Sequence, residues 1–169
     1  MAAKALPPDE FDPVGIAFVT GSVSAPGFVE AMEPNLPAGH PLRPLVFADR
    51  PGSPNPEPTV NLLLRHGVKA CLEYQKTGSI ERARAESNPD LSSHLSFVDL
   101  GGHGYATVRA SSEVFETEFV CIPRPLERSD RADGAPLVYR VTHRAAMWGR
   151  GQSPALTQRV VEGNPVFSL

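Results

Sequence analysis

Proline is the feature that most limits how this chain can fold. The 169 residues contain 18 prolines, and a cluster of them lies between Pro34 and Pro58. Proline lacks the backbone N–H that helix interiors and sheet ladders need, so this stretch is incompatible with a central strand or a long helix. We therefore expect residues 24–58 to form an irregular excursion, serving either as a functional loop or as a linker.

Outside this excursion, the spacing of apolar residues predicts helices. Positions 60, 63, 64, 67, 68, 71 and 72 fall on one helical face, so we expect one continuous helix over residues 59–77. Thr59 is its expected N-cap and Gly78 its expected left-handed C-cap. A second, shorter helix is expected over residues 80–86, with Ser79 as its cap, because Pro89 must follow its end.

From residue 95 onward the period changes to two, which predicts strands. Between Phe115 and Cys121, the alternation places residues 115, 117, 119 and 121 on one face and the glutamates on the other. The short links between strands favour an antiparallel meander. Residues 149–169 are polar and rich in glycine, so we expect a loosely ordered tail. The predicted fold class is α+β, mostly antiparallel strands with one main helix. The expected strands are 14–23, 95–100, 105–110, 115–122 and 137–143.

Charge and hydropathy exclude several classes of function. With 16 basic and 19 acidic residues the net charge is −3, so the chain has no basic field and nucleic acid is not an expected partner. No stretch approaches the roughly 18 apolar residues of a membrane span. The first residues carry no apolar run, so we expect no signal peptide. The chain as written would therefore stay in the cytoplasm, and the localisation of the protein is left open.

The cysteines and the known catalytic motifs give little chemistry. Cys71 and Cys121 lie in apolar runs and are interpreted as small buried hydrophobes, and whether they pair is left open. The sequence contains no phosphate-binding glycine loop, no zinc-binding H-E-x-x-H helix and no G-x-S-x-G nucleophile elbow. Any site must therefore be built from less familiar patterns.

Three residues are candidates for a pocket or for positioning a site: Ser22, Ser24 and His103. His103 lies in a glycine turn before a strand, and a histidine there can act as a ligand or general acid, or simply make a local hydrogen bond. Tyr105 stands where a second histidine would complete a Gly-His-x-His metal pair, so no metal site is predicted. Ser22 and Ser24 lie in a loop that can offer hydroxyls and amides to an anion.

Several runs of sequence resemble a known family. They begin Ile16-Ala-Phe-Val-Thr-Gly-Ser-Val-Ser-Ala-Pro-Gly27 and continue with Asn61 to Gln75, Asn88-Pro-Asp-Leu91, Phe97-Val-Asp-Leu-Gly-Gly-His-Gly-Tyr105 and Glu118-Phe-Val-Cys-Ile-Pro-Arg124. Together they resemble the C-terminal region of the alkaline phosphatase D (PhoD-like) family over roughly residues 10–145. The resemblance implies that residues 1–148 are the C-terminal part of a calcineurin-like α/β/β/α sandwich.

The resemblance also implies a chemistry that this chain does not complete. The family hydrolyses phosphate mono- or diesters with iron and calcium and is often exported, but its ligands lie upstream of the matched region. No Gly-Asp dipeptide occurs here, so no cofactor is expected in this chain. The first hypothesis is therefore a C-terminal portion of a PhoD-like phosphatase, inactive alone and able to handle a phosphate ester only when completed.

The partner of such a portion is expected to be the missing N-terminal half, or a second copy bound through an exposed apolar sheet face. The alternative hypothesis is a stand-alone α+β binding or interaction module that has lost phosphatase chemistry. A third is an intact enzyme that uses His103 with Asp99 or Asp90. The residues leave open whether this chain is itself an enzyme.

Overall fold

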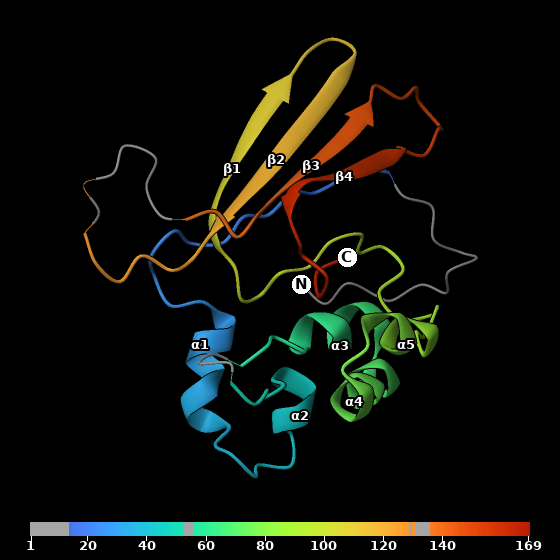
Figure 1. Cartoon of the computed structure of the whole chain (residues 1–169). Coiled ribbons are helices and arrows are strands. Elements are labelled where there is room, and N and C mark those ends of the chain that lie inside the picture. The colour runs from blue at the N-terminus through green and yellow to red at the C-terminus, as the bar shows by residue number, and fades with distance from the viewer. Residues whose placement is uncertain (1–13, 53–55, 129, 131–135) are drawn as a thin grey trace. The chain divides into compact units, whose positions relative to one another are not determined.

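The computed structural model describes residues 14–52, 56–128, 130 and 136–169. These residues belong to two separate units, a helical unit (28–101 and 166–169) and a sheet unit (14–27 and 102–165). The two kinds of element, helices and an antiparallel sheet, make the chain an α+β protein (Figure 1). The helical unit contains α1 (Phe28–Met32), the 3-10 helix η2 (Glu33–Asn35), α2 (Arg43–Val46), α3 (Val60–His66), α4 (Val68–Thr77) and α5 (Ile80–Ala85).

The proline-rich excursion, expected to be irregular, contains short helices. A proline occupies the first or second position of both η2 and α2, where its missing N–H has no partner to lose and its fixed φ suits a helix start. Phe47, which follows α2, is 1% exposed and packs with Leu36, Val46 and Val60. The excursion is therefore part of a hydrophobic core, which excludes a free linker for these described residues.

The single helix predicted over residues 59–77 is wrong, because the chain breaks it at Gly67. Gly67 has a φ of 93°, a left-handed value that ends α3 before α4 begins. A side chain there would lie 3.3 Å from the Leu91 side chain. The break rotates the apolar face, so Val68 and Leu72 are about half exposed although the pattern placed them inside.

The predicted caps agree with the structure at two of three positions. Ser79 accepts a hydrogen bond from the Arg82 amide and begins α5. Gly78 ends α4 in the left-handed conformation with φ 67°. Thr59 precedes α3 but makes no capping bond, since its hydroxyl donates to the Pro44 carbonyl at 3.3 Å instead. That bond ties α3 to the excursion, which sequence spacing does not reveal.

The strand expected over residues 95–100 is also wrong. These residues form no strand, and side-chain bonds from α3 position the segment. Asn61, 1% exposed, accepts the Leu100 amide at 3.0 Å and donates to the Asp99 carboxylate at 3.3 Å. A buried amide that satisfies a loop can replace the ladder bonds that a strand would supply.

The sheet unit is an antiparallel meander in the order β1-β2-β3-β4. Three strands lie where the alternation predicts them, and the fourth lies in the segment expected to be a loose tail. The polar residues of β4 pair with β3 along its length, so hydrogen bonding rather than hydrophobicity orders that segment. Residues 14–23, expected as a strand, form none. The strands are β1 (His103–Ala110), β2 (Val114–Ile122), β3 (Tyr139–Ala146) and β4 (Leu156–Gly163).

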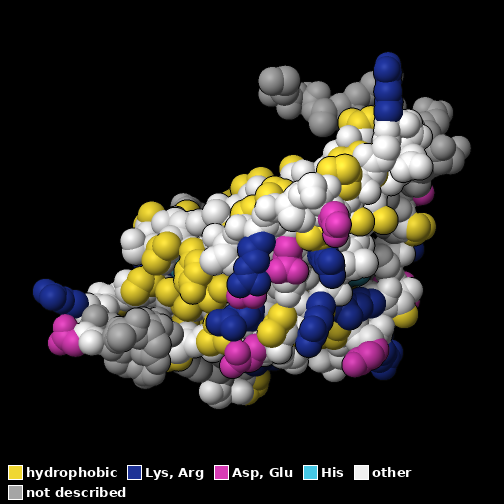
Figure 2. Space-filling model, turned by 90° about the horizontal axis from the view of Figure 1, so that it is seen from above, with side chains coloured by type: hydrophobic (Ala, Val, Ile, Leu, Met, Phe, Trp, Pro, Cys, Tyr) yellow, Lys and Arg dark blue, Asp and Glu magenta, His cyan; other side chains and the backbone are white. Residues whose placement is uncertain are grey.

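The two faces of the sheet differ in chemistry. Register places Phe115, Thr117, Phe119 and Cys121 on one face, as the alternation predicts, opposite buried positions of β3. The other face carries ion pairs between strands, Arg109 with Glu116 at 3.6 Å and Arg140 with Glu118 at 3.2 Å. Figure 2 shows basic and acidic side chains next to one another, with hydrophobic side chains gathered beside them. The charged face is a solvated surface.

Candidate functional site

The candidate site is a turn at Ser22–Ala25 that precedes α1. The Ser22 hydroxyl oxygen accepts two backbone amides, from Ser24 at 3.3 Å and from Ala25 at 2.9 Å. A serine that bonds to amides two and three residues ahead closes a turn without help from the rest of the chain. Both serines are exposed to solvent. The loop predicted from Ser22 and Ser24 is therefore a defined turn.

This turn joins the start of β1, where the third predicted residue lies. The Gly104 amide donates to the Ser22 carbonyl at 3.3 Å, and His103 beside it is 5% exposed. Gly104 has a φ of 150°, and a Cβ there would lie 1.9 Å from the Val120 carbonyl oxygen. Because glycine has no Cβ, β1 can approach β2 closely at this position while the Gly104 amide bonds to the Ser22 carbonyl. The structure brings Ser22 next to the residue that follows His103.

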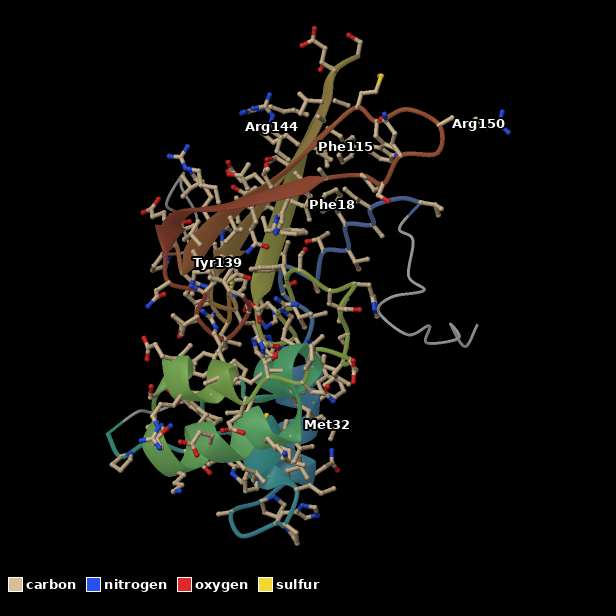
Figure 3. All side chains as sticks on the ribbon, turned by 90° about the vertical axis from the view of Figure 1, so that its right-hand side faces the viewer. Phe18, Met32, Phe115, Tyr139, Arg144 and Arg150 are labelled. Atoms are coloured by element: carbon tan, nitrogen blue, oxygen red, sulfur yellow. The ribbon has the colours of Figure 1, made fainter. Side chains whose placement is uncertain are left out.

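A third segment meets the same turn from the end of β2. The Arg124 Nε donates to the Ser24 carbonyl at 3.1 Å. Upstream of the turn, the Phe18 ring lies against Phe119 at 6.3 Å between centroids and against His143 at 6.0 Å. Figure 3 shows Phe18 and Phe115 close together within the sheet unit. Phe18 therefore attaches its segment to the apolar face of the sheet, although the segment forms no strand.

The geometry limits what this turn can do chemically. The Ser22 oxygen is engaged as an acceptor of two amides, a structural role that holds the turn. Asp99 and Asp90, considered as partners for His103, belong to the helical unit. The Asp99 carboxylate accepts Asn61 and the Gly101 amide at 2.9 Å, and this shows a loop-positioning role. The Ser24 and Ala25 amides donate to the Ser22 hydroxyl and the Arg124 guanidinium donates to the Ser24 carbonyl, so the contacts seen here hold the turn in place.

Metal donors do not gather in the part of the chain that the structure describes. Among residues 14–52, 56–128, 130 and 136–169, no three His, Cys, Asp or Glu side chains come together in a group able to hold a metal ion. Cys71 and Cys121 are both free and buried. Burial raises the pKa of the Cys71 thiol to about 12, the opposite of the shift that a reactive or metal-binding thiolate requires. The donor set here does not fit iron or calcium.

Sequence reasoning missed an apolar groove at the far end of β2 and β3. Its volume is about 270 Å³, and Trp148 and Met147 contribute exposed apolar surface to it. None of Ser22, Ser24 and His103 lines it. Single apolar residues after a strand carry no periodic signal, so the groove could not be read from the pattern. Its lining residues are Ser111, Val114, Phe115, Ala145, Ala146, Met147 and Trp148.

A buried histidine beneath Phe18 was likewise not predicted as part of a cluster. His143, 1% exposed, lies with its Nε2 2.9 Å from the Gln158 amide oxygen. Burial lowers the pKa of His143, and the Gln158 contact opposes that shift only in part. The imidazole packs edge-on against Phe119 at 5.3 Å. Its neighbour on β2, Thr117, is fully buried, so this strip of the core is polar.

Comparison with known proteins adds no relative. No family model, no curated protein and no solved structure matches this chain. No helix of the described residues is long and apolar enough to cross a membrane. The turn at Ser22–Ala25, with its contacts to Gly104 and Arg124, is the best-defined candidate site.

Proposed function

We propose that this chain is the C-terminal portion of a PhoD-like alkaline phosphatase and serves as scaffold for a metal centre held by residues outside 1–169. The observation that carries the proposal is the convergence at the Ser22–Ala25 turn. Gly104 and Arg124, from two further runs of the family resemblance, both bond to this turn. If these runs come from the fold of one family, they should contact one another in space although they lie far apart in the sequence.

In this proposal the three predicted residues have positioning roles. Ser22 closes the turn, Ser24 presents its carbonyl to Arg124, and His103 is the buried first residue of β1. The sheet unit would contribute strands to a calcineurin-like sandwich. The described residues hold no suitable donor group, so none of them is assigned as a metal ligand. Iron and calcium would be held by the upstream part of the enzyme.

Exposed apolar side chains supply a surface for that upstream part. Val108, Phe115 and Val160 lie on the same face as Phe119, and they are 55%, 39% and 38% exposed. A row of exposed aliphatic and aromatic groups is a common mark of an interface. We propose that the missing phosphatase half covers this face, with a second copy of the chain as its substitute when that half is absent.

Metal analysis and an activity assay test the proposal on the chain itself. We expect the purified protein to hold no stoichiometric iron or calcium and to show no hydrolysis of p-nitrophenyl phosphate. A tightly bound ion together with activity that a chelator abolishes would overturn the proposal. The DNA upstream supplies the second test: an open frame in phase that encodes Gly-Asp-x-x-His supports a phosphatase portion, and its absence refutes one.

A second candidate function is a stand-alone binding module. The observation in its favour is that each unit has its own organisation: the helical unit packs Leu62, Ala70 and Tyr74 into a core, and the sheet unit is lined by Phe18. A module of this kind should melt cooperatively as an isolated chain, whereas a severed portion should melt broadly or aggregate. Calorimetry at several protein concentrations separates the two outcomes.

A further inference from the structure

Residues 166–169 form a short segment that packs on the helical unit, although the chain just before it belongs to the sheet unit. Residues 102–165 are part of the sheet unit, and the chain returns to the helical unit only at Val166. The segment contains no helix and no strand. Its contacts with the helical unit come from α3, α4, α5 and the loop that follows α5. The helical unit therefore holds these four residues as a receptor holds a short peptide.

Three main-chain oxygens of this segment accept hydrogen bonds from the helical unit. The Arg84 Nη2 donates to the Val166 oxygen at 2.9 Å and to the Leu169 oxygen at 3.3 Å. The Val98 amide donates to the Ser168 oxygen at 3.0 Å. Every peptide carries such oxygens, so these bonds hold the backbone of a segment without selecting its sequence.

Phe167 makes the side-chain contact that depends on sequence. Its ring meets the Tyr74 ring edge-on, with centroids 5.1 Å apart and planes inclined by 88°. It also packs against the buried cluster that contains Leu62, Ala70 and Ala83. An edge-to-face pair adds attraction beyond the burial of apolar surface. The helical unit thus offers one position that favours an aromatic residue.

The last residue of the segment meets two basic side chains. Leu169 is the last residue of the printed sequence, so in this chain its main-chain oxygen belongs to a carboxylate. His66 Nε2 lies 3.3 Å from this oxygen, which also accepts from Arg84. The other ring nitrogen of His66 lies 2.9 Å from the Ser87 hydroxyl, which orients the imidazole. The segment and the surface are therefore complementary in charge, and hydrogen bonds to a carboxylate are stronger than those to a neutral carbonyl.

We propose that the helical unit binds short peptides that carry an aromatic residue two positions before a carboxyl end, through a docking surface made of His66, Tyr74, Arg84 and Val98. Residues 166–169 occupy this docking surface as an exchangeable ligand of the same chain. Main-chain bonds supply affinity and the aromatic position supplies specificity, as in other modes of peptide recognition. A tethered segment acts at an effective concentration of about 1 mM, so it excludes other peptides until it is released. This function goes beyond the proposed phosphatase scaffold, since the docking surface shares no residue with the Ser22–Ala25 turn.

Fluorescence anisotropy with a labelled peptide tests the docking surface on the full chain. The probe is Pro-Val-Phe-Ser-Leu, the sequence of residues 165–169, with a free carboxylate. Phe167→Ala removes the ring that holds the chain's own segment, so this variant should bind the probe at least about tenfold more tightly than the unaltered chain. The peptide Pro-Val-Ala-Ser-Leu should bind to the variant at least about tenfold more weakly than the probe. Equal affinities of the two peptides, or of the two chains, would overturn the proposal.

Phe28→Ala is the matched control variant. Phe28 lies in α1 of the same unit, and it is 48% exposed. Removal of this ring leaves residues 166–169 in place, so the affinity for the probe should stay within about twofold of that of the unaltered chain. Binding as tight as that of Phe167→Ala would show a general loosening of the helical unit and would overturn the proposal.

Amide exchange in the unaltered protein decides the matter if Phe167→Ala fails to fold. The Val98 amide is protected by the Ser168 carbonyl, whereas the Cys71 amide is protected by the Gly67 carbonyl at 3.3 Å, next to the core of the helical unit. Release of residues 166–169 exposes Val98 without opening α4, so the protection factor of Val98 should be at least about tenfold lower than that of Cys71. Equal protection would show that the segment leaves only when the whole unit unfolds, and this result would overturn the proposal.

Discussion

Phe18 stacks on Phe115 with ring centroids 5.8 Å apart and planes inclined by 16°. The contact attaches a segment without regular structure to the second strand of the sheet (Figure 3). Offset stacking of this kind adds attraction beyond the burial of two rings. The segment that contains the Ser22–Ala25 turn is therefore positioned by side-chain packing, with few main-chain bonds of its own.

Replacement of Phe18 by alanine should destabilise the sheet unit. We expect Phe18→Ala to lower the free energy of unfolding by about 2 kcal/mol, less than for a fully buried phenylalanine because Phe18 is only partly buried. Urea unfolding followed by the fluorescence of Trp148 measures it, since this is the single tryptophan of the chain. Val19→Ala, at a residue 85% exposed, should cost less than about 0.5 kcal/mol. Equal effects of the two substitutions would contradict the packing role of Phe18.

A side chain at position 104 should separate the first two strands. Gly104→Ala places a Cβ 1.9 Å from the Val120 carbonyl oxygen, so β1 must move away from β2 and from Ser22. We expect a loss of roughly 2–4 kcal/mol, from strain and lost ladder bonds. Amide exchange across β1 and β2 measures the change. Gly15→Ala, with nothing within 4 Å of the new Cβ, is the control and should be nearly neutral.

The stability of the sheet unit should fall as the pH drops below about 6.5. Burial lowers the pKa of His143 in the folded chain, whereas the unfolded chain takes up the proton near the ordinary histidine value of about 6.5. The unfolded state therefore binds more protons in this window, and the free energy of unfolding decreases as the pH falls toward the folded pKa. Above this window His143 contributes no pH dependence.

Substitution of His143 separates this effect from other acid-sensitive groups. His143→Leu should flatten the dependence of the Trp148-detected unfolding midpoint on pH below about 6.5. Val141→Ala provides the control, because it alters a fully buried residue of the same strand that binds no proton, and it should leave the slope unchanged. A variant at position 143 with the same slope as the original chain would show that this histidine is not responsible.

Cys71 should react with thiol reagents only when the helical unit opens. A pKa of about 12 in place of about 9 reduces the thiolate fraction at pH 8 by about a thousandfold, and the side chain is also fully buried. We expect iodoacetamide to label it at least about a hundredfold more slowly in buffer than in denaturant. Cys121→Ser leaves a single thiol and makes the assignment unambiguous. Rapid labelling of that variant in buffer would contradict the burial.

Much of the sheet could be predicted because strand patterns are local. Alternation between Phe115 and Cys121 determines which residues face the core, and the short link at Ser111–Glu113 determines an antiparallel partner. The caps at Ser79 and Gly78 depend on one residue each and were predictable for the same reason. The Ser22–Ala25 turn is equally local, since the Ser22 hydroxyl accepts from amides two and three residues ahead.

The amino-acid sequence alone determined the elements whose bonds lie within a few residues: the meander of β1 to β3, the two caps and the serine turn. Only the tertiary structure decided the break at Gly67, the ordering of β4, and the meeting of Ser22 with Gly104. The physical reason is the range of the interactions, because a packing partner, a ladder partner or a contact between a turn and a strand comes from residues that no local pattern brings together.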